Sequence, residues 1–228
     1  GRGGGDVSWV ALALVVAAAV VAARWYAGRV DELGRRRDFP LVSVVLLVLL
    51  AVGAATPGVL RARQERRLAG VASALAGRPV AVRCQAFGGA FVDAGVELGY
   101  VRWRADGTPE RWTLLKRQAC RDLAAYVRAG GRRPSRSQVI AVHVLTHEAM
   151  HLAGHTDESV AECAAVQRDA RTARLLGAAD ADAAGLAAAY WHDLYPLMPD
   201  GYRSPECRSG GALDERLADA PWLAPMRS

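Results

Sequence analysis

The chain has 228 residues, of which 52% are hydrophobic, and a formal net charge of +6. This length allows one globular domain with additional segments, and the hydrophobic excess suggests that part of the chain lies in lipid. Nearly all of the positive charge comes from arginine, since Lys116 is the only lysine. The arginines are scattered among acidic residues rather than collected in a basic stripe, so we do not expect nucleic-acid binding.

Two uncharged stretches near the N-terminus predict transmembrane helices. Residues 7–23 contain no charged side chain, and neither do residues 39–60. A helix of about 20 apolar residues is long enough to cross the hydrocarbon core of a bilayer. We therefore expect a membrane anchor with two transmembrane helices over residues 1–58, followed by a second domain over residues 59–228.

The arginines around these stretches give conflicting evidence on orientation. Those between the two stretches favour a cytoplasmic loop by the positive-inside tendency, which would place the following domain outside. The sequence Arg35-Arg36-Arg37 before an apolar run also resembles a signal anchor, which supports the same side. Four arginines after the second stretch favour the opposite orientation: Arg61, Arg63, Arg66 and Arg67. On balance we expect an extracytoplasmic domain tethered to the cell membrane.

The cysteines are compatible with an exterior location. Four widely spaced residues follow the apolar stretches, with no C-x-x-C pair among them: Cys84, Cys120, Cys163 and Cys207. An even number in an oxidising compartment indicates two disulfides, for which three connectivities exist that the sequence does not distinguish. We expect Cys84–Cys120 and Cys163–Cys207, with ordinary buried thiols as the alternative in a cytoplasmic domain.

The spacing of hydrophobic residues predicts an α+β second domain. Runs of β-branched and aromatic residues predict a small antiparallel or mixed sheet, with strands near residues 79–87, 96–103 and 110–115. Helical spacing predicts five further helices, at about residues 59–76, 117–129, 135–154, 156–176 and 179–195.

The helix predicted over residues 135–154 contains the motif His147-Glu148-Ala149-Met150-His151. Positions i and i+4 lie on the same face of a helix, so both imidazoles can bind one metal ion. Glu148 lies about 100° further round the helix, where it can accept a proton from a metal-bound water. The sequence thus predicts a Zn²⁺ site in which Glu148 is the catalytic base.

A catalytic zinc needs a third protein ligand and one open position. Three acidic residues after the expected helix end at Gly154 compete for this role. We favour Glu158, which lies about as far beyond the turn as His151 lies before it. Glu162 is one turn deeper on the same face, and Asp157 occupies the third-histidine position of the longer H-E-x-x-H-x-x-G-x-x-H motif. A ligand from further along the chain stays open, and an acid at a helix start is also favoured by the helix dipole alone.

Other polar residues are candidates for supporting roles. His143 lies one turn before His147 and is expected to pack beside the site or support a ligand. His155 lies beyond the helix end, where it approaches the substrate or is exposed. Four residues are candidates for donating a hydrogen bond to a developing oxyanion: Tyr190, His192, Tyr195 and Tyr202.

The motif and its uncharged flanks, Val144, Leu145, Leu152 and Ala153, resemble the zincin metallopeptidases. The resemblance covers about ten residues strongly. It implies that the two histidines of the motif bind zinc and that its glutamate is the general base and later proton donor. It also implies a strand beside the motif helix that holds an extended peptide.

Outside these ten residues the chain departs from the known zincin groups. Gly154 fits the metzincin continuation, but Asp157 replaces the third histidine, and Met198 is only a weak candidate for the methionine turn. A glutamate ligand on the next helix resembles the gluzincins, although the spacing here is short. The stretch from Thr146 to Cys163 is similar to membrane-anchored metalloproteins of high-GC actinobacteria.

We therefore expect a membrane-tethered, extracytoplasmic zinc peptidase acting on peptide or protein substrates. One alternative is a non-catalytic, metal-stabilised envelope or interaction domain in which a fourth protein ligand closes the zinc site. Another is a structural envelope component that carries the motif by chance. The sequence contains no signature of a particular substrate or oligomeric state.

Overall fold

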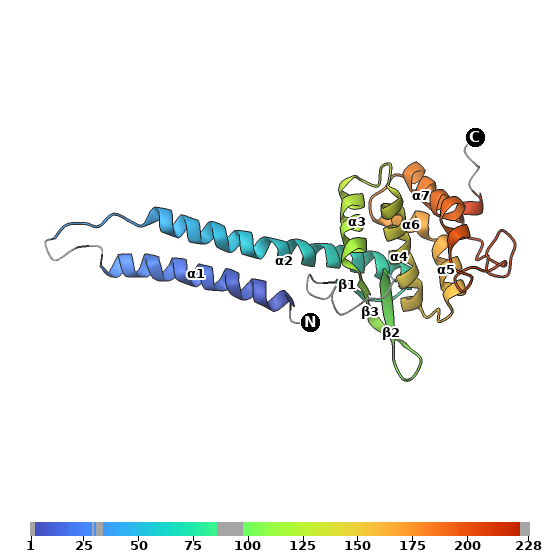
Figure 1. The fold of residues 1–228 in the computed structure, drawn as a ribbon, viewed down its shortest axis with the longest axis horizontal. Helices are drawn as coiled ribbons and strands as arrows, with labels where there is room; N and C mark the ends of the chain where they lie inside the picture. The colour runs from blue at the N-terminus through green and yellow to red at the C-terminus, as the bar shows by residue number, and fades with distance from the viewer. Residues whose placement is uncertain (1–2, 29, 31–33, 86–97, 224–228) are drawn as a thin grey trace. The chain divides into compact units, whose positions relative to one another are not determined.

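The computed structural model describes residues 3–28, 30, 34–85 and 98–223. Within these residues it has seven α-helices and one three-stranded mixed sheet (Figure 1). The chain divides into two compact units, with the division between Arg63 and Gln64. The predicted α+β class, with a small sheet and two long apolar N-terminal helices, is confirmed.

The first unit contains helix α1 (Gly3–Ala27) and the beginning of α2 (Leu41–Ala76). Both helices are long and apolar enough to cross a membrane. Large hydrophobic side chains such as Trp9, Val42 and Leu49 are exposed on them, as expected where lipid replaces water. The helix predicted over residues 59–76 is the continuation of α2, which passes through Pro57 without a break.

The second unit contains the sheet, made of β1 (Ala81–Cys84), β2 (Gly99–Trp103) and β3 (Pro109–Leu115). The strand order is β1-β3-β2, with β1 parallel and β2 antiparallel to β3. A tight turn joins β2 to β3, in which Gly107 has a φ of 75°. Asp106 stabilises this turn by accepting a hydrogen bond from the backbone N–H of Thr108 at 2.9 Å. Because β3 is the central strand in this order, β2 lies at an edge among the described strands.

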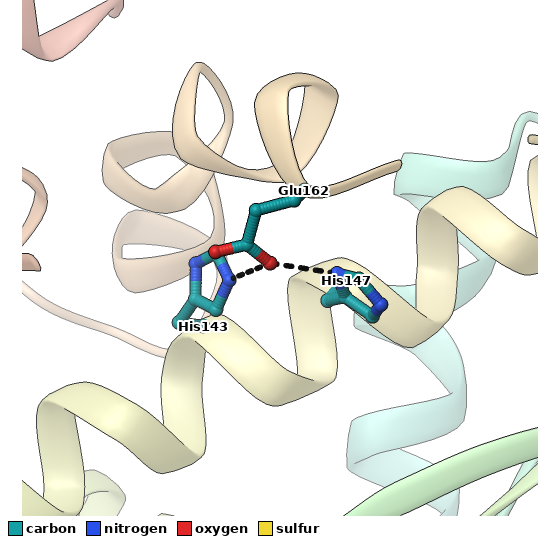
Figure 2. Close-up of side chains that lie close together, drawn as sticks. All are labelled: His143, His147 and Glu162. Carbon is teal, nitrogen blue, oxygen red and sulfur yellow. Dashed lines mark hydrogen bonds and ion pairs between the residues drawn. The ribbon is translucent and has the colours of Figure 1, made fainter. Parts of the chain in front are cut away.

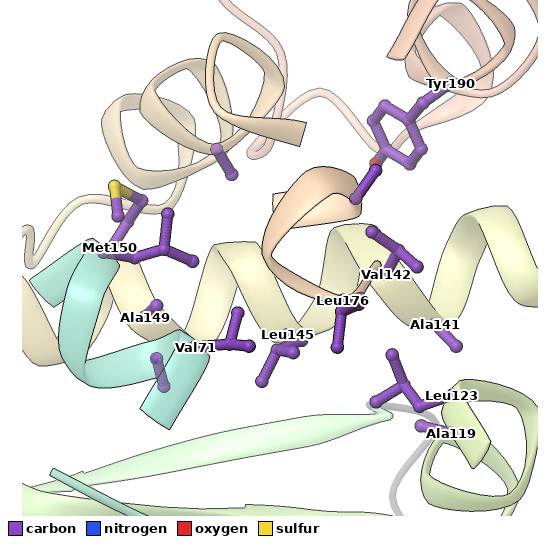
Figure 3. Packing of buried hydrophobic residues seen from close by; sticks show 14 of the residues in the cluster. Val71, Ala119, Leu123, Ala141, Val142, Leu145, Ala149, Met150, Leu176 and Tyr190 are labelled. Carbon is purple, nitrogen blue, oxygen red and sulfur yellow. The ribbon is translucent and has the colours of Figure 1, made fainter. Parts of the chain in front are cut away.

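Helix α4 (Arg136–Ala153) is the central element of the second unit. It packs against β2 and β3, against α3 (Arg117–Arg128), and against three helices that follow it in the chain. Figure 3 shows side chains of α4 such as Val142, Leu145 and Met150 among hydrophobic residues of α2, α3 and α7. Because α4 is surrounded by other elements, polar side chains on it must find partners inside the domain.

Three helices follow α4, namely α5 (Glu158–Val166), α6 (Asp169–Leu175) and α7 (Asp180–Asp193). The prediction of one continuous helix over residues 156–176 is wrong, because the chain bends between α5 and α6. The buried side chain of Gln167 donates a hydrogen bond to Leu213 O at 2.9 Å and accepts one from Glu215 N at 2.8 Å. Its amide binds the C-terminal segment at the point where the helix is interrupted.

Two disulfides join elements of the second unit. Cys84 of β1 is bonded to Cys120 of α3, and Cys163 of α5 is bonded to Cys207 in the C-terminal segment. Both predicted pairings are confirmed. The second disulfide matters for the site, because it attaches α5 covalently to the chain that follows α7.

Candidate metal centre

The motif helix α4 is fixed at both ends by local interactions. At its start, Ser135 Oγ accepts a hydrogen bond from Gln138 N, and the Gln138 side chain accepts one from Ser135 N at 2.9 Å. At its end, Gly154 has a φ of 115°, a left-handed conformation that favours glycine. These two caps define the helix on which His143, His147 and His151 occupy successive turns.

Three donor atoms converge at one point beside α4. His147 Nε2 lies 2.9 Å from His151 Nε2 and 3.1 Å from Glu158 Oε2, and His151 Nε2 lies 3.2 Å from the same oxygen. Two ligands bound at about 2.1 Å to a tetrahedral ion are about 3.4 Å apart. The arrangement therefore fits a metal ion with small adjustments of the side chains.

The opposite side of each imidazole ring has its own partner. His151 Nδ1 lies 2.7 Å from the carbonyl oxygen of His155, to which it donates. His147 Nδ1 lies 2.9 Å from Glu162 Oε2, an ion-pair distance at which the N–H is poorly aligned (Figure 2). With the proton held on Nδ1, each Nε2 presents a lone pair to the shared point.

The three acidic residues at the start of α5 occupy different positions relative to the motif histidines. Asp157 caps the helix, because its carboxylate accepts hydrogen bonds from Val160 N at 3.0 Å and Ser159 Oγ at 2.7 Å. Glu158, the first residue of α5, lies next to the two imidazoles. Glu162, one turn later, lies between His143 and His147 and approaches His147 from its Nδ1 side (Figure 2). The structure thus places Glu158 with the motif histidines, Glu162 on the far side of one ring, and Asp157 in a cap.

A buried network extends from Glu162 away from this point. His143 lies between two carboxylates, with Nε2 at 2.9 Å from Glu162 Oε2 and Nδ1 at 2.8 Å from Asp169 Oδ2. Tyr190 stacks on the His143 ring and donates a hydrogen bond to Glu162 Oε1 at 2.6 Å. His143, His147 and Glu162 form a second, buried set of donor groups that could hold a metal ion.

The surroundings favour a positive charge at two of the three histidines, whereas burial and the neighbouring His147 lower the pKa of His151. Burial lowers the pKa of His143, but Asp169 and Glu162 outweigh this effect and raise it to about 10. At His147, burial again lowers the pKa, while hydrogen bonds to Glu158 and Glu162 raise it to about 9. Hydrogen bonding to His147 also lowers the pKa of Glu158. The surroundings that stabilise an added proton at His147 also favour a metal cation there.

Glu148 is buried between α4 and the sheet. Thr113 Oγ1 of β3 donates a hydrogen bond to Glu148 Oε2 at 3.3 Å. Gly99 of β2 lies directly against the carboxylate, where an added Cβ would be 2.8 Å from Oε1 and 2.9 Å from Cγ. The general base that the sequence predicts is therefore positioned by two strands that the motif alone does not reveal.

The candidate metal centre opens into a cavity of about 510 Å³. Glu148, His147, His151 and Glu158 line it, as do residues of β2. Further lining comes from other residues of α4 and α5 and from α7 and the segment after it, including Tyr190, Leu194, Leu197, Met198 and Tyr202. A largely apolar cavity with a few convergent polar groups is typical of a binding site.

The structure separates the four candidates for oxyanion stabilisation. Tyr202 lines the cavity, and its ring centre lies 5.8 Å from that of His147. Tyr190 also lines the cavity, but its hydroxyl donates to Glu162. Tyr195 exchanges hydrogen bonds with the backbone of Ser204, and His192 lines a separate pocket. Tyr202 is therefore the candidate placed closest to the predicted chemistry.

Comparison with known proteins gives no match for this chain among protein families, curated proteins or solved structures.

Proposed function

We propose that the chain is a zinc-dependent peptidase tethered to a membrane. One observation carries the proposal: two imidazoles and a carboxylate converge within 3.2 Å of one another in the cavity that Glu148 also lines. Zn²⁺ suits this set because it prefers nitrogen and oxygen donors, and three protein ligands leave the open position that catalysis requires. The other ligands of a closed structural site are lacking at this point among the described residues.

In the proposed hydrolysis, the metal ion and three parts of the chain have separate roles. Zn²⁺ held by His147, His151 and Glu158 would supply Lewis-acid chemistry, which would polarise a peptide carbonyl and acidify water. Glu148 takes the proton of the attacking water and returns it to the leaving amine. The Tyr202 hydroxyl donates a hydrogen bond to the developing oxyanion. The edge strand β2 aligns an extended substrate through its backbone.

The location outside the cytoplasm is supported by two features of the chain. Helices α1 and α2 have the length and composition of membrane spans. All four cysteines are paired in disulfides, which persist in oxidising compartments and are rare in the cytosol.

A metal-stabilised domain without catalytic activity is the second candidate function. The observation that favours it is the buried set His143, His147 and Glu162, which is enclosed by α4, α5 and α7. A metal ion held there would be bound by side chains that are at most 8% exposed and already bonded to one another, so its role would be to stabilise the fold. Binding of a hydroxamate inhibitor to the zinc-loaded chain separates the two candidates, because only the open site accepts it.

The replacement Glu148→Gln tests the catalytic proposal directly. The amide that replaces the carboxylate cannot accept a proton, so we expect hydrolysis of a quenched fluorescent peptide library to fall by at least about 100-fold. Zinc content, measured by mass spectrometry on the full chain in detergent, should stay the same because this residue is not a ligand. In contrast, His151→Ala should lose both zinc and activity.

A matched control is Glu110→Gln, which makes the same chemical change on β3 outside the cavity. It should hydrolyse the library at the parent rate. If Glu148→Gln also did so, Glu148 would not be the base and the proposed reaction would be wrong.

A further inference from the structure

The cavity follows one face of α4 away from the metal centre. Four residues spaced by one helical turn line it, namely Arg136, Ile140, Val144 and Glu148. Between Val139 and Leu152 every side chain of α4 is buried except Ile140 and Val144, which are partly exposed. These two apolar residues therefore form an accessible floor on a helix that is otherwise enclosed.

The far end of this floor carries a positive charge. Arg136 is exposed in the first turn of α4, and no other arginine or lysine lines the cavity within the part of the chain that the structure describes. Over the same described residues, its guanidinium forms no ion pair or hydrogen bond. An arginine with no internal partner at the mouth of an apolar cavity is suited to binding a carboxylate of a ligand.

Resting on the proposed peptidase function, we propose that the substrate is a peptide with apolar residues beside the cleaved bond and a carboxylate that binds Arg136. The apolar side chains of the peptide contact Ile140 and Val144, and Leu98 and Leu194 also line the cavity that holds them. The carboxylate comes from an acidic side chain or from the C-terminus of the peptide.

The geometry of α4 gives the distance between the substrate carboxylate at Arg136 and the cleaved bond near Glu148. Arg136 precedes Glu148 by twelve positions, which corresponds to about 18 Å along an α-helix. An extended peptide covers this distance in about five residues, since each adds about 3.3 Å. The carboxylate should therefore lie about five residues from the cleaved bond, always on the same side of it.

The number of residues between the carboxylate and the cleaved bond can be measured from cleavage specificity. The full chain, purified in detergent and loaded with zinc, is incubated with a decapeptide library. Mass spectrometry of the products should show acidic residues, or the peptide C-terminus, enriched about five residues from the cleaved bond. Amidation of the peptide C-terminus distinguishes the two sources, because it abolishes the enrichment only if the terminal carboxylate is responsible.

Matched substrates and variants then test Arg136 itself. Replacing the carboxylate of a cleaved peptide by an amide should lower kcat/KM about fivefold, mainly through KM, as expected for a partly solvated ion pair. Arg136→Gln should remove this difference, and Arg136→Glu should favour a lysine at that substrate position. Arg132→Gln, a control at an exposed arginine outside the cavity, should retain the preference for the carboxylate.

The outcomes distinguish this inference from the function on which it rests. Cleavage that depends on Glu148 but is equal for carboxylate and amide peptides would overturn the inference alone. Lack of cleavage that depends on Glu148 would overturn the inference and the proposed function together.

Discussion

The position of Glu148 depends on a residue that has no side chain. Gly99 lies on β2, 49 residues earlier in the chain, yet it faces the carboxylate closely. A Cβ at this position would approach Oε1, Cγ and Cδ of Glu148 to between 2.8 and 3.0 Å, closer than such atoms normally pack. Glycine at position 99 is therefore what allows the Glu148 carboxylate to lie between helix and sheet.

The replacement Gly99→Ala should reduce activity without removing the metal. The added methyl group must displace the Glu148 side chain, and a displacement of about 1 Å in a catalytic group can cost about 100-fold in rate. We expect kcat to fall by at least tenfold, while zinc binding measured by competition with a chelator stays within about twofold of the parent.

Gly185→Ala provides the matched control, because nothing lies within 4 Å of a Cβ added at that position in α7. This variant should keep full activity. Full activity in Gly99→Ala would show instead that Glu148 moves freely, and the close contact would have no catalytic meaning.

The sequence predicted that certain residues lie together at the candidate site, namely those whose spacing follows one local pattern. The motif histidines and Glu148 could be predicted from helical periodicity, and Glu158 from its distance beyond the turn at Gly154. The contacts of Gly99 with Glu148 and of Asp169 with His143 could not be predicted from the sequence, because each contact joins two separate secondary-structure elements. No local pattern specifies how such elements pack, so these partners required the three-dimensional structure.

At the scale of secondary-structure elements, His143 connects three helices. It lies on α4 and contacts Glu162 of α5 and Asp169 of α6, all of them buried. Removing the protonated imidazole of His143 leaves the carboxylates of Glu162 and Asp169 in the core without a compensating positive charge. The packing of α5 and α6 against the motif helix therefore depends on this histidine.

The variant His143→Gln should lower the free energy of unfolding by about 3–5 kcal/mol at pH 6. The pKa of this histidine is about 10 in the folded protein, against an ordinary value of 6.5. Its charge thus stabilises the fold fully below about pH 6.5, and this contribution is lost as the pH rises towards 10. Urea unfolding in the presence of a chelator, followed by tryptophan fluorescence, should show a difference from the parent that shrinks between pH 6 and pH 10.

His192→Gln is the corresponding control, since this histidine is exposed and lies outside the network. Its unfolding free energy should match the parent at each pH. A pH-independent loss in His143→Gln would indicate that packing alone, rather than charge, links the helices.

The elements themselves were largely predictable, with one informative exception. The predicted bounds of the motif helix, 135–154, agree with the observed caps at Ser135 and Gly154, because capping residues are local signals. The interruption between α5 and α6 was missed, because Gln167 is compatible with a helix in isolation. Its hydrogen bonds to Leu213 and Glu215 decide the conformation, and those residues lie more than 40 positions later.

At the scale of the whole molecule, the two apolar helices and the disulfides both give evidence on which side of the membrane the second unit lies. The arginines on either side of the second apolar stretch favour opposite orientations, so charge alone does not determine the topology. The two disulfides lie in the second unit and require an oxidising environment to persist. Together with two helices that are long and apolar enough to span a membrane, they favour a cytoplasmic loop between α1 and α2 and a second unit outside.

Reporter fusions in a bacterial host can test this topology, because β-lactamase confers ampicillin resistance only when it is exported from the cytoplasm. A fusion after Ser209, in the second unit, should confer resistance, whereas a fusion after Gly34, between the two apolar helices, should not. The two sites are separated by one predicted span, so they must lie on opposite sides if α2 crosses the membrane. Resistance from the Gly34 fusion alone would place the second unit in the cytoplasm, and the proposed extracytoplasmic peptidase would then be wrong in its location.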